Sequence, residues 1–337
     1  MAFWRAGGVP CGHPMTASSL DWRARLEACG FEGARLVPAT YAAQVLWSWR
    51  EPLAAEAALR EHLEQQPEDK DALQTLISIL RESGRADDIA PLRRQLHERR
   101  CRDLRVPEEA RAEVIAFLEA AETGAPPPER MADAYVAALF DVYAPSFDDS
   151  LRGFLAYQAP ERLMDAVREA LGERRALDVL DLGCGTGLAG PLLRPFARRL
   201  EGIDLSKGML ARASERRVYD ALRAGELGAE LAASEAHHDL IVAVDVLVYF
   251  GALEEVFERV ARRLAPGGLF AFTVEKGTEP GYRLLPTARY VHHLDYLRAC
   301  ARAAGLHPVL EREATLRRQG GQPVIGHVVV LTTARRA

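Results

Sequence analysis

The sequence predicts an α/β protein with a mostly parallel β-sheet covered by helices on both faces, preceded by a smaller region made only of helices. In the second half of the chain, short apolar segments alternate with amphipathic helical segments, which is the pattern of a parallel sheet. In the first half, apolar residues recur at helical spacing. The length of 337 residues exceeds one average domain and suits two.

Composition is that of an ordinary globular protein, with 48% hydrophobic and 27% charged residues. The formal net charge of -5 gives no general attraction to nucleic acid or to an anionic membrane, so we expect neither as a partner. No apolar segment approaches the roughly 20 residues that cross a bilayer, and the first residues lack the apolar core of a signal peptide. We therefore expect a cytoplasmic location.

The cysteines favour neither disulfides nor a metal centre. Five of them are scattered along the chain, and an odd number does not suit the disulfide framework of a secreted protein. Cys11-Gly12-His13 has no second pair of ligands at a suitable spacing, so we predict no metal site.

Residues 1–39 form an N-terminal segment of uncertain structure. A short helix is expected over 22–31, ended by Gly30, and residues 34–37 suit either a strand or extended chain. We assign no role to this segment.

Residues 40–122 are predicted to be a helical domain. Two apolar stripes follow each other, separated by a turn at 67–69, and Gly84-Arg85 interrupts the pattern after the second. The stripes consist of Ala54, Ala55, Ala58, Leu59 and Leu63, and of Ala72, Leu73, Leu76, Ile77 and Leu80. The pattern resembles one to two tetratricopeptide (TPR) units of roughly 34 residues, although Ile89 and Arg93 depart from it. Such helices either form a groove for a protein or peptide, or extend the core of the next domain.

A proline-rich segment at 123–128 is the predicted linker. Three consecutive prolines lack amide donors, so they cannot continue the helix expected over 108–122. The second domain then covers 129–337, and it begins with helices near 131–143 and 159–171.

Seven strands are expected in this second domain. The last two flank Gly320-Gly321, which fits an antiparallel hairpin at the sheet edge, and an amphipathic helix is expected over 252–264. The strands are predicted at 177–182, 200–204, 217–220, 239–244, 269–274, 308–313 and 324–332.

A glycine-rich loop directly follows the first of these strands. Gly183, Gly185 and Gly187 come after Asp181 at alternate positions, and glycine tolerates positive φ and close approach of a ligand to the backbone. This pattern predicts a nucleoside-cofactor cradle at the carboxyl end of the strand. Dinucleotide enzymes usually have the third glycine one residue later, where this chain has Leu188, so a nicotinamide cofactor is disfavoured.

Four blocks in this order resemble the class I S-adenosylmethionine-dependent methyltransferases. They are the glycine loop from Asp181, the segment from Asp204 to Leu210, the segment 238–249, and the segment 264–272. The resemblance implies a Rossmann-like, seven-stranded, mostly parallel sheet with an antiparallel last strand. Residues 135–148 also look like the lead-in of predicted TPR-containing methyltransferases of the Williams-Beuren-region type, which extends the likeness over 40–332.

The resemblance also implies roles for individual residues toward S-adenosylmethionine. Asp181 would orient the loop and meet the cationic amino group, Asp204 would accept the ribose hydroxyls, and Glu226 with the Leu227 amide would face the adenine. Three assignments have alternatives: Glu226 as an exposed helical residue, Asp245 as a turn cap or a substrate contact, and Tyr143 as a core residue instead of an aromatic lid. The complete expected cofactor set is Asp181, Gly183, Cys184, Gly185, Gly187, Asp204, Leu205, Met209, Glu226, Leu227, Asp245 and Tyr143.

Methyl transfer from a sulfonium needs little from side chains beyond holding the acceptor in line and excluding water. A general base is needed only if the acceptor must lose a proton. Weak candidates on the substrate side are Arg289, Tyr290, His292 and Asp245, with capping and loop packing as the alternative. Cys184 is a common filler of this loop in the family and is not expected to be a nucleophile.

The predicted function is methyl transfer from S-adenosylmethionine to a small-molecule or peptide acceptor, with the helical region aiding recognition of the acceptor or of a partner. The fourth strand is not followed by the Pro-Cys or Asn-Pro-Pro-Tyr of enzymes that methylate bases, which disfavours nucleic acid as acceptor. The main alternative is a non-catalytic cofactor-binding scaffold that holds a protein partner through its TPR-like helices.

Overall fold

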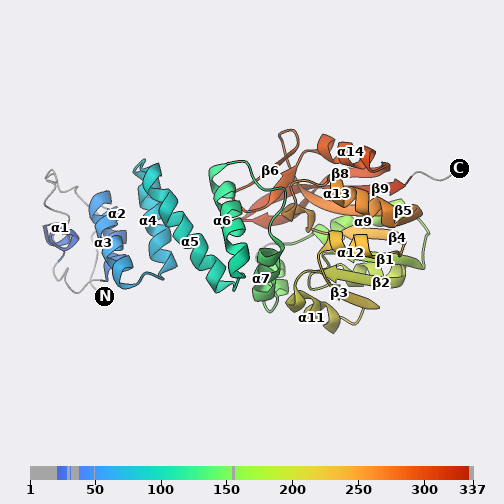
Figure 1. Ribbon diagram of the computed structural model, residues 1–337, viewed down its shortest axis with the longest axis horizontal. Coiled ribbons are helices and arrows are strands. Elements are labelled where there is room, and N and C mark those ends of the chain that lie inside the picture. The colour runs from blue at the N-terminus through green and yellow to red at the C-terminus, as the bar shows by residue number, and fades with distance from the viewer. Residues whose placement is uncertain (1–20, 29–30, 32–37, 49, 154–155, 334–337) are drawn as a thin grey trace. The chain divides into compact units, whose positions relative to one another are not determined.

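The computed structural model describes residues 21–28, 31, 38–48, 50–153 and 156–333. Contacts between Cα atoms divide the chain into two compact units, Met1–Asp103 and Leu104–Ala337. The first is helical where described, and the second combines helices with a sheet (Figure 1). The division precedes the expected linker because the helix over 108–123 packs within the second unit, where the Phe117 ring lies 6.0 Å from that of Tyr290.

The helices and strands are named as in Figure 1. The described part of the first unit contains α1 (Trp22–Ala28), α2 (Ala39–Ser48), α3 (Pro52–Gln65), α4 (Lys70–Glu82) and α5 (Ile89–Asp103). The helices of the second unit are α6 (Glu108–Thr123), α7 (Asp133–Tyr143), α8 (Phe147–Gly153), α9 (Ala159–Leu171), α10 (Gly190–Leu193), α11 (Lys207–Glu215), α12 (Leu227–Ala233), α13 (Glu254–Arg263) and α14 (Leu294–Ala303). Its strands are β1 (Leu177–Leu182), β2 (Ala197–Asp204), β3 (Ala221–Ala224), β4 (His238–Ala243), β5 (Leu264–Lys276), β6 (Tyr282–Leu284), β7 (Tyr290–His292), β8 (Leu306–Gln319) and β9 (Gln322–Thr333).

The helical unit buries the two apolar stripes that the sequence predicts. Ala55 and Ala58 of α3 and Leu73 and Leu76 of α4 are fully buried. The side chain of Asp69 caps α4 by accepting from the amide of Ala72 at 2.9 Å, which satisfies one of the free N–H groups of the first turn. The expectations for Cys11–His13, Gly30 and residues 34–37 lie outside the described residues.

The main sheet has the order β3-β2-β1-β4-β5-β9-β8. The pairs from β3 through β5 are parallel, and β9 and β8 are antiparallel. The parallel sheet and the antiparallel hairpin beside it are thus as predicted. Because parallel strands end at the same edge, β1, β2 and β4 direct their carboxyl-terminal residues to one region.

The prediction of seven strands is corrected, since the sheet has nine strands within the described residues. The additional strands, β6 and β7, form an antiparallel hairpin, and β7 pairs with the last two residues of β5. Since β9 pairs with β5 as far as Glu275, this small hairpin uses the other edge of β5, beyond the end of β4. Each strand has three residues, too few to give a periodic pattern in the sequence.

The third strand was also misplaced by four residues. The sequence prediction was 217–220, and β3 spans Ala221–Ala224. Arg217 has a positive φ of 55°, and Tyr219 turns its side chain to Asp181 instead of pairing in the sheet. The strand-forming preference of Val218-Tyr219 was therefore overridden by a tertiary hydrogen bond.

Helices cover both faces of the sheet and bury a core on each. Leu180 and Leu182 of β1 face one core, to which α12, α13 and α14 contribute, and Leu177 and Val179 face the other, which includes α9. Each buried Leu or Val contributes roughly 1.5–3 kcal/mol, so the alternation along β1 fixes its register. In the part of the chain that the structure describes, no helix combines the length and apolar character needed to span a bilayer.

Candidate active site

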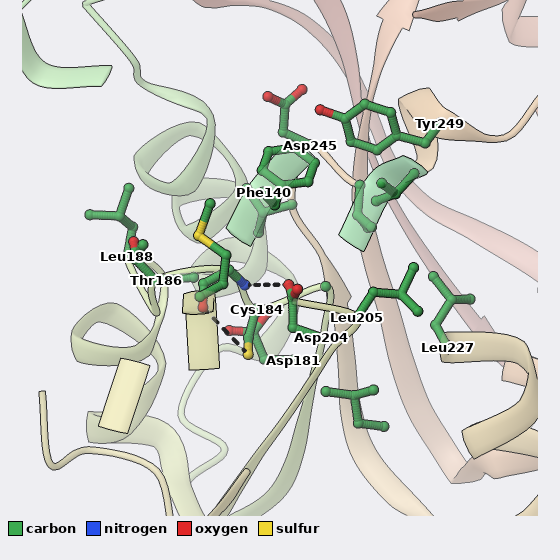
Figure 2. Close-up of a pocket in the computed structure, with 18 of the residues that line it drawn as sticks. Phe140, Asp181, Cys184, Thr186, Leu188, Asp204, Leu205, Leu227, Asp245 and Tyr249 are labelled. Carbon is green, nitrogen blue, oxygen red and sulfur yellow. Dashed lines mark hydrogen bonds between the residues drawn. The ribbon is translucent and has the colours of Figure 1, made fainter. Parts of the chain in front are cut away.

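A pocket opens at the carboxyl ends of β1, β2 and β4, within the second unit. It holds about 1000 Å³ of empty space, part of which is open to solvent. Figure 2 shows Asp181 and Asp204 toward one end of the group, Asp245 and Tyr249 toward the other, and Phe140 between them. Ten of the twelve expected cofactor residues line it: Asp181, Gly183, Cys184, Gly185, Asp204, Leu205, Met209, Glu226, Leu227 and Asp245.

The glycine loop has the backbone geometry that only glycine adopts easily. Gly183 and Gly185 have φ values of 65° and 55°. A Cβ at Gly183 would lie 2.4 Å from Val246 Cγ2, so the loop can lie against the residue after Asp245 only without a side chain. Gly187 also has a positive φ, but it packs against Tyr219 and does not line the pocket, which corrects its assignment.

Asp204 joins the glycine loop to the end of β2. Its Oδ2 accepts the amide of Gly185 at 2.8 Å, and its Oδ1 accepts the amide of Ser206 at 2.8 Å. Burial raises the pKa of Asp204, and the backbone hydrogen bonds oppose that rise. Each carboxylate oxygen can accept a further hydrogen bond, so Asp204 can still bind a diol.

Asp181 is almost fully buried in the wall of the pocket. Burial raises its pKa to about 7, although the Tyr219 hydroxyl donates to Oδ2 at 2.7 Å and the carboxylate of Asp204 raises the pKa further. Among the described residues, the partner of this buried carboxylate is the Tyr219 hydroxyl, and no cationic side chain pairs with it. A ligand ammonium group beside it would supply that partner.

Glu226 lies at the start of α12 and lines the pocket. Its side chain accepts the amide of Ala229 at 2.6 Å, and Oε1 accepts from Arg130 at 3.1 Å. Burial opposes the negative charge, but hydrogen bonds from Gly228 and Ala229 and the charge of Arg130 bring its pKa below the usual value. Glu226 is therefore an ionised acceptor at this rim, and not an exposed helical residue.

Helices α7 and α8 line the pocket with residues that sequence reasoning missed. Val136, Phe140 and Phe147 line it, and the two phenylalanine rings meet edge to face at 5.9 Å. Tyr143, the expected aromatic lid, is 48% exposed at the end of α7 and does not line the pocket. Phe140, one turn earlier on α7, occupies the wall instead, with its ring 5.6 Å from that of Tyr249.

Two aspartates attach these helices to the cofactor loops. Asp141 Oδ1 accepts from the Ser206 hydroxyl at 2.5 Å and from the Gly208 amide at 2.9 Å. Asp148 accepts from the Thr186 hydroxyl at 2.5 Å and forms an ion pair with Arg216. The position of α7 and α8 over the pocket is therefore set by contacts to the same loops that carry the rim acids.

The other end of the pocket contains a charged pair. Asp245 has a positive φ of 56° and a backbone amide bonded to Thr273 Oγ1 at 2.9 Å, which turns the chain at the end of β4. Arg289 Nη1 contacts both of its carboxylate oxygens at 3.3 Å. Burial opposes the charge of Arg289, but Asp245, Tyr249 and Glu275 raise the pKa of its guanidinium well above the usual value.

Tyr290 and His292 do not reach the pocket, which corrects their assignment to the substrate side. Both are fully buried in β7, where the Tyr290 hydroxyl donates to the carbonyl of Pro128 and His292 Nε2 lies 3.1 Å from the carbonyl of Gly251. Burial lowers the pKa of His292 to about 4. Of Arg289, Tyr290 and His292, only Arg289 lines the pocket, because the residues after it pair in the small hairpin.

Cys184 has no nucleophilic character here. Its side chain is buried in the glycine loop, and burial raises the pKa of the thiol well above the usual value. Since the thiolate is the reactive form, Cys184 is an uncharged part of the wall.

Comparison with known proteins gives the class of this site. Residues 155–318 match the family model described as "Methyltransferase domain". Methyltransferase-like protein 27 of Homo sapiens is 35% identical over 141 residues, which cover 40% of this chain and 55% of that protein. The malonyl-[acyl-carrier protein] O-methyltransferase of Enterobacter lignolyticus is 31% identical over 148 residues, or 44% of this chain and 55% of that one. The chain thus spans about half the length of the curated relatives it matches.

Among solved structures, the [4+2]-cyclase SpnF is similar with a TM-score of 0.50 and 18% identity, over 61% of this chain and 98% of that one. This likeness concerns the fold alone. Residues 155–318 therefore form an S-adenosylmethionine-dependent methyltransferase domain of the Rossmann-like α/β class, with S-adenosylmethionine as the cofactor.

The pocket fits that cofactor. The backbone at Gly183 has no room for a side chain, and Asp204 presents a fixed carboxylate. Asp181 is buried, and no cation in the described part of the chain pairs with it. Leu205 and Leu227 add apolar wall, and in Figure 2 both lie to the right of Asp181 and Asp204.

Proposed function

We propose that the chain transfers a methyl group from S-adenosylmethionine to a small-molecule acceptor. The observation that carries this proposal is one pocket that contains the bare glycine loop, Asp181, Asp204 and Glu226 within a matched methyltransferase domain. The relative named for malonyl-[acyl-carrier protein] supports an acyl group as the acceptor, either free or carried on a protein, and a peptide acceptor is also compatible with the pocket.

The residues divide the pocket into two ends. Asp181 would bind the ammonium group, Asp204 the ribose hydroxyls, and Glu226 with the Leu227 amide the adenine. When bound, the cofactor supplies an electrophilic methyl group on a sulfonium. The acceptor then lies toward Asp245, Tyr249 and Arg289, and Phe140 and Phe147 keep water out of the space between.

Catalysis by this chain depends mainly on position. Holding the acceptor lone pair in line with the methyl group is worth several kcal/mol in such displacements, about 7–11 kcal/mol at best. Asp245 is the carboxylate at the acceptor end that can accept a proton if the acceptor must lose one. No residue is required as a covalent nucleophile.

The finer assignments belong to the same proposal. The helical unit is TPR-like and helps to select the acceptor or a protein partner, and the chain belongs to the TPR-containing subtype. A cytoplasmic location agrees with the thiols of Cys184 and Cys300, which form no disulfide with each other.

A second candidate is a scaffold that binds the cofactor without transferring its methyl group. It is favoured by one observation, since a protein titled a cyclase has a similar fold, and fold alone does not fix the reaction. The two candidates differ in turnover and not in cofactor binding.

Incubation of the full chain with methyl-tritiated S-adenosylmethionine and separated small-molecule and protein fractions of a cell extract tests the proposal. We expect label in the small-molecule fraction, and less label at the same cofactor concentration in Asp204→Ala. Cofactor binding without label in any fraction would favour the scaffold. Label confined to the protein fraction would contradict a small-molecule acceptor.

A further inference from the structure

Four charged side chains, two buried and two partly buried, meet at the acceptor end of the pocket. They are Asp245, Glu275, Arg289 and Arg317, and they form a network of ion pairs. Only Asp245 and Arg289 line the pocket, and Arg289 is the single basic side chain among the described residues that do so. The methyl-transfer reaction described above gives Arg289 no specific role beyond its position at the acceptor end.

The pairs in this network are unequal. Arg317 Nη2 donates to Glu275 Oε1 at 2.6 Å, and both side chains are almost completely buried behind the pocket. Arg289 contacts Asp245 at 3.3 Å, through three N–O pairs, and Glu275 at 3.1 Å. Charge-assisted hydrogen bonds of this kind normally measure about 2.7–2.9 Å. The tight pair therefore lies at the back, and the loose pair faces the pocket.

Hydroxyl groups stand beside the same guanidinium. The Tyr249 oxygen accepts from Arg289 Nη2 at 2.9 Å, which leaves the phenol proton to donate. Tyr157 also lines the pocket near these charges, and burial raises the pKa of both phenols, so both remain protonated donors. The acceptor end thus offers a planar guanidinium and phenol protons together.

The charges at this end decide which acceptor fits. Two carboxylates and two guanidinium groups sum to zero, so the network leaves the positive sulfonium of a bound cofactor uncompensated. An anionic acceptor would neutralise it, whereas a cationic acceptor would add a second positive charge in a buried space. Asp245 does not offset this, because Arg289 and Arg317 already contact its carboxylate.

We propose that the methyl acceptor carries a carboxylate, which Arg289 binds through its guanidinium with help from the Tyr249 hydroxyl. This inference rests on the proposed function and names the acceptor class for the same pocket. Arg289 is then a specificity-determining residue, and its contact with Asp245 holds the guanidinium in place before the acceptor arrives.

The direct test is calorimetric titration of the full chain saturated with S-adenosylhomocysteine, which lacks the methyl group. The probes are benzoate, phenylacetate, malonate, succinate, glutarate and adipate, each compared with its amide or diamide. We expect at least one acid to bind about tenfold or more tightly than its amide, as for a ligand carboxylate in a charge-assisted pair. If no acid of the set binds more tightly than its amide, the proposal is overturned.

Variants then assign the preference to Arg289. Arg289→Gln should reduce the acid-to-amide ratio to near one, and Arg289→Lys should leave an intermediate ratio, because lysine keeps the charge and loses the planar fork. Arg283→Gln is the matched control, since Arg283 is an exposed arginine six residues earlier that pairs with Glu279. A full preference retained in Arg289→Gln would contradict the proposal.

Two measurements keep the result interpretable. Comparison of acid and amide on the unchanged chain needs no variant, so misfolding of Arg289→Gln does not remove the test. Binding of S-adenosylhomocysteine is measured first in every variant. If the cofactor product fails to bind the unchanged chain, the proposed function fails, whereas if it binds and no acid is preferred, only the carboxylate assignment fails.

Discussion

The amide of Gly185 donates a hydrogen bond of 2.8 Å to Oδ2 of Asp204. This contact joins the loop after β1 to the last residue of β2, so the two parts of the expected cofactor cradle are positioned as one unit. Because Ser206 binds the other carboxylate oxygen, the orientation of Asp204 is fixed before any ligand binds. Such preorganisation reduces the entropy that binding must offset.

Asp204→Ala is expected to weaken the binding of S-adenosylhomocysteine by about 1–3 kcal/mol, since the diol and two backbone amides lose their acceptor. Titration calorimetry measures this change. Asp165→Ala, on the exposed face of α9, is the control and should leave the affinity unaltered. If Asp204→Ala binds S-adenosylhomocysteine as tightly as the unchanged chain does, the assignment of Asp204 to the ribose hydroxyls is wrong.

Cofactor binding is expected to depend on pH through Asp181. Burial raises its pKa to about 7, so the group is protonated below that pH in the empty pocket. Pairing with an ammonium group requires the carboxylate, and binding below pH 7 must therefore release a proton. The affinity should fall by up to about tenfold for each pH unit below 7 and remain level above it.

Titrations of S-adenosylhomocysteine from about pH 5.5 to about pH 8.5 check this dependence, because Asp181 changes charge within this range. Asp181→Asn cannot ionise, so its affinity should be lower above pH 7 and nearly independent of pH. The same dependence in both proteins would assign the titration to another group.

Two glycines of the loop should respond differently to alanine. Gly183→Ala adds a Cβ only 2.4 Å from Val246 Cγ2, whereas a Cβ at Gly185 meets nothing within 4 Å. Both substitutions force alanine into a left-handed conformation at about 1–2 kcal/mol, and overpacking adds about 1–3 kcal/mol at Gly183 alone. Denaturant unfolding of the unliganded chain should therefore rank Gly183→Ala as the less stable variant.

A smaller side chain at Val246, which relieves the contact with the added Cβ of Gly183→Ala, provides the control. Val246→Ala combined with Gly183→Ala should recover part of the lost stability, while Val246→Ala combined with Gly185→Ala should recover none. Equal losses for the two single variants would mean that space at Gly183 is not what requires glycine.

Asp141→Ala is expected to loosen α7 without unfolding the domain. It removes the acceptor of the Ser206 hydroxyl and the Gly208 amide, worth about 1.5–3 kcal/mol for hydrogen bonds to a charged group. Hydrogen exchange should become faster in Asp133–Tyr143 by roughly tenfold or more and stay unchanged in Ala159–Leu171. Uniform acceleration in both helices would indicate global destabilisation instead.

The sequence predicted the cofactor end of the pocket better than the acceptor end. Asp181, Asp204 and Asp245 lie at or just after the carboxyl ends of β1, β2 and β4, and parallel strands bring such residues to one edge of the sheet. Phe140 and Phe147 were not assigned, because an apolar face on a helix has the same pattern whether it packs on a core or lines a pocket.

Tertiary contacts account for the remaining differences. The hydrogen bond from Tyr219 to Asp181 joins residues 38 apart, and the contact of Arg289 with Asp245 joins residues 44 apart. Neither contact produces a periodic pattern in the sequence from which it could be predicted. Tyr290 and His292 were misassigned because two strands of three residues bury them, and segments this short are not visible in the pattern of the sequence.

A crystal structure of the full chain with S-adenosylhomocysteine tests the central claim most directly. The account predicts the ribose hydroxyls on Asp204, the ammonium group beside Asp181, and the sulfur directed to the end where Asp245, Tyr249 and Arg289 lie. A pocket that stays empty at saturating ligand, or a ligand bound away from the Gly183–Gly185 loop, would contradict it.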